Sequence, residues 1–175
     1  DTNMFVPLDR DHEDTMLAHE AIRNRYGEPD ENALAGLPDT ETPLLLAVGR
    51  LVARKGYRTL LKAMPDVLKS FPRAHLVIVG RGHMKRTLER QAKRLGVSES
   101  VTIEPGLPFD ELAQLFRSAD LVAYPSYYEG QGLIPLEAMA SGTPVVTVDD
   151  GPLPEMVDDS VGGLFDIDQT GTLAK

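Results

Sequence analysis

The 175-residue sequence contains no cysteine, which excludes disulfide frameworks, thiolate catalysis and cysteine-ligated zinc. No stretch approaches 18 consecutive apolar residues, and the N-terminus shows neither the basic segment nor the apolar core of a signal peptide. We therefore expect a soluble, cytoplasmic protein. The four histidines do not pair at metal-ligand spacing, so we expect no metal site.

Positive charge is also scarce. The sequence has 18 lysines and arginines against 27 aspartates and glutamates, and its net charge is −9. Such an acidic surface argues against binding of nucleic acid, whose phosphates require a positive surface. Any anionic ligand must therefore be held by a local basic site that acts against the overall field.

The sequence does contain a regular alternation of strand-like and helix-like patterns. Short apolar, β-branched runs predict strands at Leu44–Val48, His75–Val79, Val101–Ile103, Leu121–Tyr124, Val145–Val148 and Gly163–Phe165. Helical spacing predicts helices at Tyr57–Ser70, Met84–Leu95 and Leu133–Ala140, and one more around Leu112, Leu115 and Phe116. The expected fold is α/β, a Rossmann-like doubly wound parallel sheet, which binds ligands at the carboxyl ends of its strands.

Residues 1–43 differ from the rest of the chain. Asp9–Tyr26 has the pattern of a polar helix, and Glu28–Thr42 is rich in Pro, Gly, Asp and Glu, as loops are. We therefore divide the chain into a segment of helix and loop, residues 1–43, and one ligand-binding domain, residues 44–175.

The loop Gly49–Gly56 follows the first predicted strand and carries three cations. Arg50 can direct two N–H groups at a phosphate, and Lys55 adds a point charge. A solvated basic turn would have the same composition, so the sequence favours the two interpretations about equally.

The loop Gly80-Arg81-Gly82 follows the second predicted strand. It lacks the third glycine of the dinucleotide fingerprint, because residue 85 is lysine. A tight turn into the next helix therefore explains the two glycines at least as well as a ligand contact does. The five cations of that helix are more typical of a solvated face than of a binding patch.

Pro135 fixes where the fourth predicted helix begins, because proline is tolerated only among the first residues of a helix. A start near Gly132 leaves the N–H groups of Gly132, Leu133 and Ile134 without helical partners. Free N–H groups at a helix start form a site for an anion or a hydroxyl. Glu129 lies on the loop just before them.

Glu137 stands out because it lies within a predicted helix of otherwise apolar residues, Leu133–Ala140. An unpaired carboxylate would be costly to bury there, so we expect it to have hydrogen-bond donors. The hydroxyls of a ligand could supply them. The less favoured alternative is that Glu137 pairs with a buried arginine or caps a backbone turn.

Taken together, these residues resemble the C-terminal, donor-binding domain of the retaining glycosyltransferases of family 4, the group 1 family, which have the GT-B fold. The resemblance covers nearly the whole chain. It rests on Asp1-Thr2 with Phe5 and Pro7, Gly49-Arg50-Leu51, Lys55-Gly56, Gly80-Arg81-Gly82, Ala119-Asp120, Pro125-Ser126, Glu129-Gly130, Glu137 and Gly142-Thr143-Pro144-Val145-Val146.

The resemblance implies that Arg50 and Lys55 bind the diphosphate of the donor and neutralise it as it leaves. It implies that Glu129 lies against the transferred sugar and that Glu137 holds the ribose hydroxyls. The base would rest near Arg81. The remaining implied donor-binding positions are Gly49, Gly106, Leu107, Gly130, Gln131, Gly132 and Leu133.

The implied activity is transfer of a sugar from a nucleoside-diphosphate sugar to a lipid, glycan or small-molecule acceptor, with retention and without a metal or other cofactor. In this family the acceptor site belongs to an N-terminal domain that this chain lacks. We therefore expect the isolated domain to be inactive and the full-length protein to be able to associate peripherally with a membrane. A noncatalytic nucleotide-sugar-binding module, or another GT-B activity such as a nucleotide-sugar epimerase, remains an alternative.

Three positions depart from the family pattern. Gln131 stands where an aromatic residue is usual, and Arg81 stands where aspartate is frequent. Both changes would alter donor preference. The segment Gly151–Glu155 has one glycine where the family usually has two, which puts the shape of that loop in doubt. Ala119-Asp120 and Pro154-Glu155 we interpret as structural.

Overall fold

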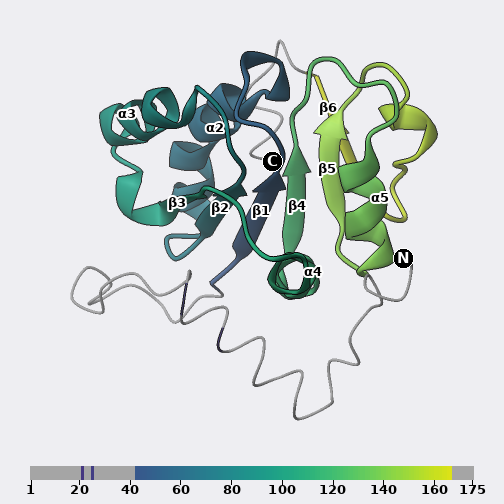
Figure 1. Cartoon of the computed structure of the whole chain (residues 1–175), viewed down its shortest axis with the longest axis horizontal. Coiled ribbons are helices and arrows are strands. Elements are labelled where there is room, and N and C mark those ends of the chain that lie inside the picture. The colour runs from purple at the N-terminus through teal and green to yellow at the C-terminus, as the bar shows by residue number, and fades with distance from the viewer. Residues whose placement is uncertain (1–20, 22–24, 26–41, 167–175) are drawn as a thin grey trace.

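A computed structural model of the chain describes residues 21, 25 and 42–166. The helix and loop predicted within residues 1–43 therefore fall almost wholly outside the described residues. Among the described residues, the strands form one six-stranded parallel sheet in the order β3-β2-β1-β4-β5-β6 (Figure 1). The strands are β1 (Leu44–Val48), β2 (His75–Val79), β3 (Val101–Glu104), β4 (Leu121–Tyr124), β5 (Val145–Val148) and β6 (Gly162–Phe165).

Helices connect most of these strands, as the alternating pattern predicted. They are α2 (Tyr57–Ser70), α3 (Lys85–Leu95), α4 (Phe109–Ser118) and α5 (Leu133–Ala140), with short 3₁₀ helices at η2 (Ala53–Lys55), η3 (Ser98–Ser100) and η4 (Leu153–Glu155). The predicted ends differ by a residue at β3, β6 and α3. The Rossmann-like parallel sheet is confirmed.

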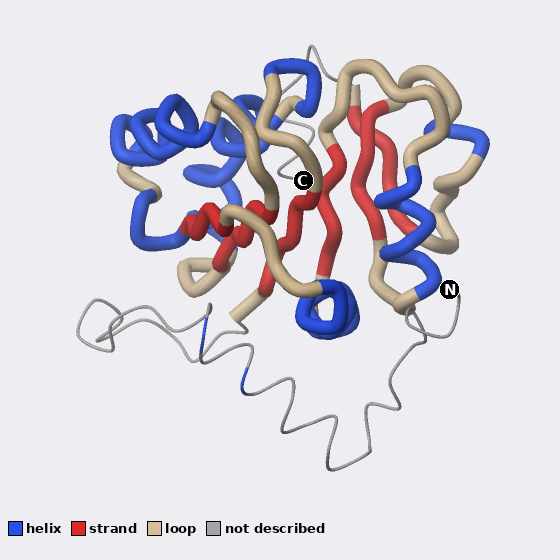
Figure 2. Tube along the Cα trace, viewed as in Figure 1, coloured by secondary structure: helices blue, strands red, loops and turns tan. Residues whose placement is uncertain are grey.

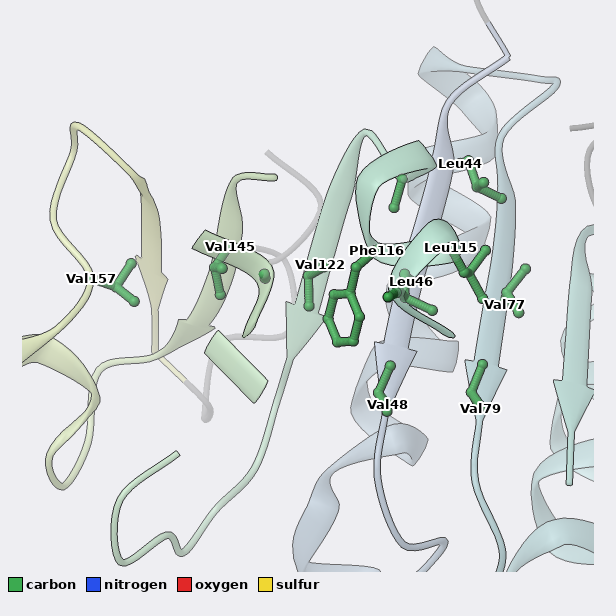
Figure 3. Close-up of a cluster of buried hydrophobic side chains, with 13 residues drawn as sticks. Leu44, Leu46, Val48, Val77, Val79, Leu115, Phe116, Val122, Val145 and Val157 are labelled. Carbon is green, nitrogen blue, oxygen red and sulfur yellow. The ribbon is translucent and has the colours of Figure 1, made fainter. Parts of the chain in front are cut away.

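Both faces of the sheet are buried because neighbouring residues of a strand point to opposite sides. On one side, Leu46 and Val122 pack with Phe116 of α4 in a buried cluster that also includes Val77 and Val145 (Figure 3). On the other side, alternate strand residues form a second cluster with α2 and α3. Continuous apolar strands are therefore the sequence signature of this two-sided core.

The site is positioned by the reversal of strand order between β1 and β4. Successive strands β1, β2 and β3 extend to one side of this point, and β4, β5 and β6 extend to the other. The loops after β1 and β4 consequently lie at the same edge, the upper one in Figure 2. At the other edge of the sheet, Asp120 links the starts of β1 and β4, because its Oδ2 accepts the Leu44 N–H at 2.7 Å. This hydrogen bond supports a structural role for Asp120.

Candidate functional site

The loops after β1 and β2 are packed against each other at the carboxyl edge. The N–H of Leu51 donates to the Arg81 carbonyl at 2.9 Å, and the N–H of Met84 donates to the Leu51 carbonyl at 3.1 Å. A β-carbon on Gly80 would lie 1.9 Å from the Gly49 oxygen, and one on Gly82 would lie 2.3 Å from the Leu51 oxygen. Close backbone packing therefore explains why residues 80 and 82 are glycine, as the tight-turn interpretation proposed.

The loop after β1 is also packed against the loop after β4. The Arg54 carbonyl accepts the Tyr127 N–H at 2.8 Å and the Ser126 hydroxyl at 3.3 Å. A β-carbon on Gly56 would lie only 1.8 Å from the Pro125 oxygen. This contact brings Lys55 and Glu129, which are 74 residues apart in the sequence, into one centre.

Lys55 is the cation at the middle of this centre, and only 9% of its surface is exposed. Its Nζ donates to Glu129 Oε1 at 2.5 Å and to the Tyr124 hydroxyl at 2.8 Å, and it lies 4.7 Å from the centre of the Tyr124 ring. The Ser126 hydroxyl also donates to Glu129 Oε1. The predicted phosphate-binding lysine is therefore neutralised by the predicted sugar-contacting glutamate.

The ionisation of Glu129 is set by opposing effects. Burial alone would raise the pKa of its carboxyl, but the hydrogen bonds from Lys55 and Ser126 and the charge of Lys55 outweigh burial and lower it. Burial, followed by the nearby negative charge of Glu129, raises the pKa of the Tyr124 hydroxyl. At neutral pH the Glu129 side chain is therefore a carboxylate and that of Tyr124 a neutral phenol.

The loop after β1 carries two further cations, Arg50 and Arg54. Arg54 Nη1 donates to the Tyr128 carbonyl at 3.0 Å and lies 3.9 Å from Glu129 Oε1. Arg50 is exposed and forms no ion pair with any of the described residues. Arg50 is thus the predicted site cation that is free to meet an incoming anion.

The start of α5 supplies the expected free N–H groups. Gly132 precedes the first helical residue, Leu133, in a left-handed conformation. The N–H groups of Gly132, Leu133 and Ile134 make no hydrogen bond to the described part of the chain. The Leu133 side chain is 60% exposed. Gly130 and Gln131, on the loop just before the helix, are exposed as well.

Glu137 corrects part of the sequence-based expectation. Its carboxylate is half-buried rather than fully enclosed, because α5 exposes Leu133 and Leu136 on its outer face. No hydrogen bond or ion pair joins the Glu137 side chain to any described residue, so no buried arginine explains it. Burial raises the pKa of this carboxyl. A polar ligand could therefore relieve a carboxylate that lacks partners.

Arg81, on the loop that follows β2, lies against the turn that follows β3. Its Nε donates to the Pro105 carbonyl at 2.7 Å, and a β-carbon on Gly106 would lie 3.5 Å from that Nε. Leu107 is half-buried against the α4 side of the core. The structure thus brings Arg81, Gly106 and Leu107 together at one end of the carboxyl edge.

Sequence reasoning missed several polar residues of the centre. Tyr124 is bonded directly to Lys55, and Ser126 to Glu129. The sequence had indicated Tyr124 only as the end of a strand and Ser126 only as part of the family pattern. Tyr57 was treated only as the start of a helix, yet its hydroxyl is buried beside Gly49. A tyrosine directly after a glycine at a helix start was the available signal.

The cations of the chain are concentrated on the side of the sheet that contains β2, α2 and α3. Residues 50–94 hold 13 of the 18 lysines and arginines but only two of the 27 acidic residues. An anion at the carboxyl edge therefore meets a locally positive field despite the net negative charge. The part of the chain that the structure describes contains no group of three or more His, Asp or Glu arranged to hold a metal ion.

These features define a Rossmann-like α/β domain whose carboxyl edge presents cations and free N–H groups to an anionic ligand. The chain belongs to the group 1 glycosyltransferases, because the model of that family, described as glycosyl transferases group 1, matches residues 30–175.

Individual relatives agree with this assignment. The chain is 41% identical over 131 residues to a D-inositol 3-phosphate glycosyltransferase of Segniliparus rotundus, covering 73% of this chain and 29% of that protein. It is 36% identical over 170 residues to a GDP-mannose-dependent alpha-(1-6)-phosphatidylinositol monomannoside mannosyltransferase of Mycolicibacterium smegmatis, covering 93% of this chain and 40% of that protein. The chain thus spans well under half the length of these relatives.

The structure is similar to the C-terminal domain of a group 1 glycosyltransferase, LpcC, from Francisella tularensis. The TM-score is 0.75 at 26% identity, with 99% of this chain and 83% of that one covered. Among the described residues, no helix combines the length and the apolar character needed to cross a membrane.

Proposed function

We propose that this chain is the donor-binding part of a retaining glycosyltransferase that takes its sugar from a nucleoside-diphosphate sugar. The observation that carries the proposal is the cation–carboxylate centre of Lys55 and Glu129 at the carboxyl edge. Its glutamate is on the loop that leads to the free N–H groups of α5. Such a centre suits the donor, because cations bind its diphosphate and a carboxylate accepts hydrogen bonds from its sugar.

In the proposed reaction, the bond between the sugar carbon and the diphosphate oxygen breaks while charge develops on the diphosphate. Arg50 and Lys55 neutralise that charge, and the N–H groups at the start of α5 donate hydrogen bonds to it. Charge stabilisation thus comes from the protein itself, and we propose that no metal or other cofactor is needed. Glu129 orients the sugar as it is transferred to the acceptor.

The remaining donor contacts follow from the placement of the predicted residues. Glu137 accepts hydrogen bonds from the ribose hydroxyls, which is supported by its half-buried carboxylate without protein partners. The base rests near Arg81 and the turn at Gly106 and Leu107. Gly49, Gly130 and Gln131 complete the surface along the same edge.

The acceptor site belongs, in this proposal, to a part of the enzyme outside this chain. This is supported by the fraction of the two relatives that the chain spans, 29% and 40%. Their names indicate acceptors that carry an inositol or its phosphatidyl derivative, so we propose a polar or lipid-linked acceptor. The isolated domain is then inactive in transfer, and the full-length protein acts in the cytoplasm, peripherally at a membrane when its acceptor is a lipid.

Calorimetric titration of the chain with UDP, GDP and ADP tests donor binding. We expect one of them to bind, and Arg50→Ala to weaken binding by about tenfold to a hundredfold, the scale of a lost charge-assisted hydrogen bond. Lys55→Ala should have a similar effect. Arg94→Ala is the matched control, since it removes an equal charge from the last turn of α3.

Unchanged affinity in both site variants would contradict the proposal, because the basic loop would then be only a solvated turn. Sugar transfer assays on a longer protein that includes the missing part distinguish the alternatives. A protein that binds the donor but transfers nothing would be a noncatalytic nucleotide-sugar-binding module.

A further inference from the structure

We propose that the Tyr57 hydroxyl is a positioning group that donates a hydrogen bond to Glu129 when a diphosphate draws Lys55 away from that carboxylate. This inference rests on the proposed function, because it requires a diphosphate to bind at Lys55. It adds a residue to the centre and assigns it a role that depends on ligand binding.

The first observation is that the Tyr57 hydroxyl is buried without a partner. Tyr57 is the first residue of α2 and is only 4% exposed. Its hydroxyl oxygen is shielded from solvent and makes no hydrogen bond to any residue that the structure describes. Leaving a buried hydroxyl unpaired is unfavourable, and phenylalanine would fill the same space without that cost. An unpaired hydroxyl therefore requires an explanation.

The second observation is where this hydroxyl lies. It is 2.9 Å from the position that a β-carbon on Gly49 would occupy, and the Lys55 Cε is 3.6 Å from the same point. The aliphatic part of Lys55 and the Tyr57 hydroxyl therefore meet at the surface of Gly49. Any residue larger than glycine at position 49 would displace the hydroxyl. The chain thus leaves room at the site for a polar group that the free protein does not use.

The third observation is electrostatic. Besides burial, the negative charge of Glu129 raises the pKa of the Tyr57 hydroxyl, so the two groups lie within each other's field. The hydroxyl is consequently protonated at neutral pH and able to donate. In the free protein, Lys55 and Ser126 both donate hydrogen bonds to Glu129 Oε1.

A bound diphosphate changes this arrangement. Its negative charge competes with Glu129 for the Lys55 ammonium, and a lysine that moves to the phosphate withdraws a charge-assisted hydrogen bond from the carboxylate. Movement of the lysine also removes the side chain that lies beside the Tyr57 hydroxyl. Tyr57 can then replace the lost hydrogen bond and hold Glu129 in place for the sugar. Tyr124 differs, because its hydroxyl is already bonded to Lys55 in the free protein.

Tyr57→Phe tests this idea, with inorganic pyrophosphate as the probe. The full chain contains no tryptophan and five tyrosines, and pyrophosphate does not absorb in the near ultraviolet, so a difference spectrum reports only on tyrosines. Tyr127→Phe is the control, because it removes a hydroxyl that is bonded to Thr59 rather than to the centre.

We expect Tyr57→Phe to unfold at an equal or higher urea concentration than the wild type in the absence of ligand. We expect it to bind pyrophosphate about threefold to tenfold more weakly, the scale of one lost neutral hydrogen bond, and to lose part of the tyrosine difference spectrum. Tyr127→Phe should retain both the affinity and the spectrum.

Two results would overturn the inference. One is a marked loss of stability in ligand-free Tyr57→Phe, which would mean that the hydroxyl already has a partner. The other is unchanged pyrophosphate affinity together with an unchanged difference spectrum. If the wild type bound neither pyrophosphate nor any of the three nucleotides, the proposed function itself would fail, and the inference would fall with it.

Discussion

Gly56 is the position where a single methyl group should reveal how tightly the two site loops are packed. It has a φ of +69° and joins η2 to α2. A β-carbon there would lie 1.8 Å from the Pro125 oxygen and 2.8 Å from the Pro125 carbon, both of them backbone atoms. Gly56→Ala therefore combines an unfavourable backbone conformation with a collision that no side-chain rotation can relieve.

Gly96 provides the matched control. Its φ is +72°, nearly the same as that of Gly56, but a β-carbon on Gly96 would have no atom within 4 Å. Gly96→Ala should therefore cost only the left-handed conformation, about 1–2 kcal/mol. Gly56→Ala should cost that amount and about 1–3 kcal/mol more for overpacking. Displacement of the loop after β4 would also weaken the hydrogen bond from Tyr127 to Arg54, at about 0.5–1.5 kcal/mol.

Urea unfolding of both variants measures the difference. We expect Gly56→Ala to be less stable than Gly96→Ala by about 1.5–4.5 kcal/mol, with similar m values. Nucleotide affinity should fall in Gly56→Ala alone, because the methyl group separates Lys55 from Glu129. If the two variants unfolded within about 0.5 kcal/mol of each other, the loops would not be packed as the structure has them.

Three further predictions concern ionisable residues. Glu137→Gln should stabilise the free domain at neutral pH, because burial raises the pKa of this carboxyl and so disfavours its charged form. The gain should vanish near pH 3, where the carboxyl is protonated in the folded and unfolded states alike. Urea midpoints at the two pH values measure this difference, and destabilisation at neutral pH would indicate a buried partner. Burial lowers the pKa of His75 to about 4, so the free energy of unfolding should fall as the pH drops from about 6.5 to about 4. His75→Gln should remove this pH dependence from the urea midpoints. If the dependence persisted in the variant, it would belong to another group. Arg90→Glu should raise the midpoint of thermal unfolding at low salt, because the new carboxylate would lie one helical turn from both Arg86 and Arg94. The increase should disappear at about 1 M salt, which screens surface charges. An increase that remained at that salt concentration would not be electrostatic.

The sequence predicted the fold well because the core is two-sided. Leu44–Val48 is apolar at every position and His75–Val79 at every position after its first, and few other structures require that pattern. Their ends were harder to place: Glu104 continues β3 although it is charged, because its neighbour in the sheet is Val79. Hydrogen bonding between strands, rather than residue type, fixed that boundary.

The site could be predicted only in part. Arg50 and Lys55 were identified because their residue types suit an anionic ligand, and Glu129 because it lies just before the free N–H groups of α5 and matches the family pattern. Their mutual arrangement was not, because the Lys55–Glu129 pair joins residues 74 positions apart. Hydrophobic periodicity locates loops but does not place side chains within them. The unpaired hydroxyl of Tyr57 could not be predicted for the same reason, since only the structure shows that it is buried and makes no hydrogen bond to the described residues.

The uneven distribution of charge along the chain makes the domain an electric dipole. Its positive end contains β2, α2 and α3, and its other end, around β5 and β6, carries the carboxylates Asp149, Asp150, Glu155, Asp158, Asp159 and Asp166. The interaction of the domain with a charged surface therefore depends on its orientation as well as on its net charge of −9. The same domain can be retained by resins of either sign at low ionic strength, each resin holding the opposite end. Two copies attract when the positive end of one meets the negative end of the other, and they repel when ends of equal sign meet. Salt screens both interactions, so it should affect association of the copies as much as pH does.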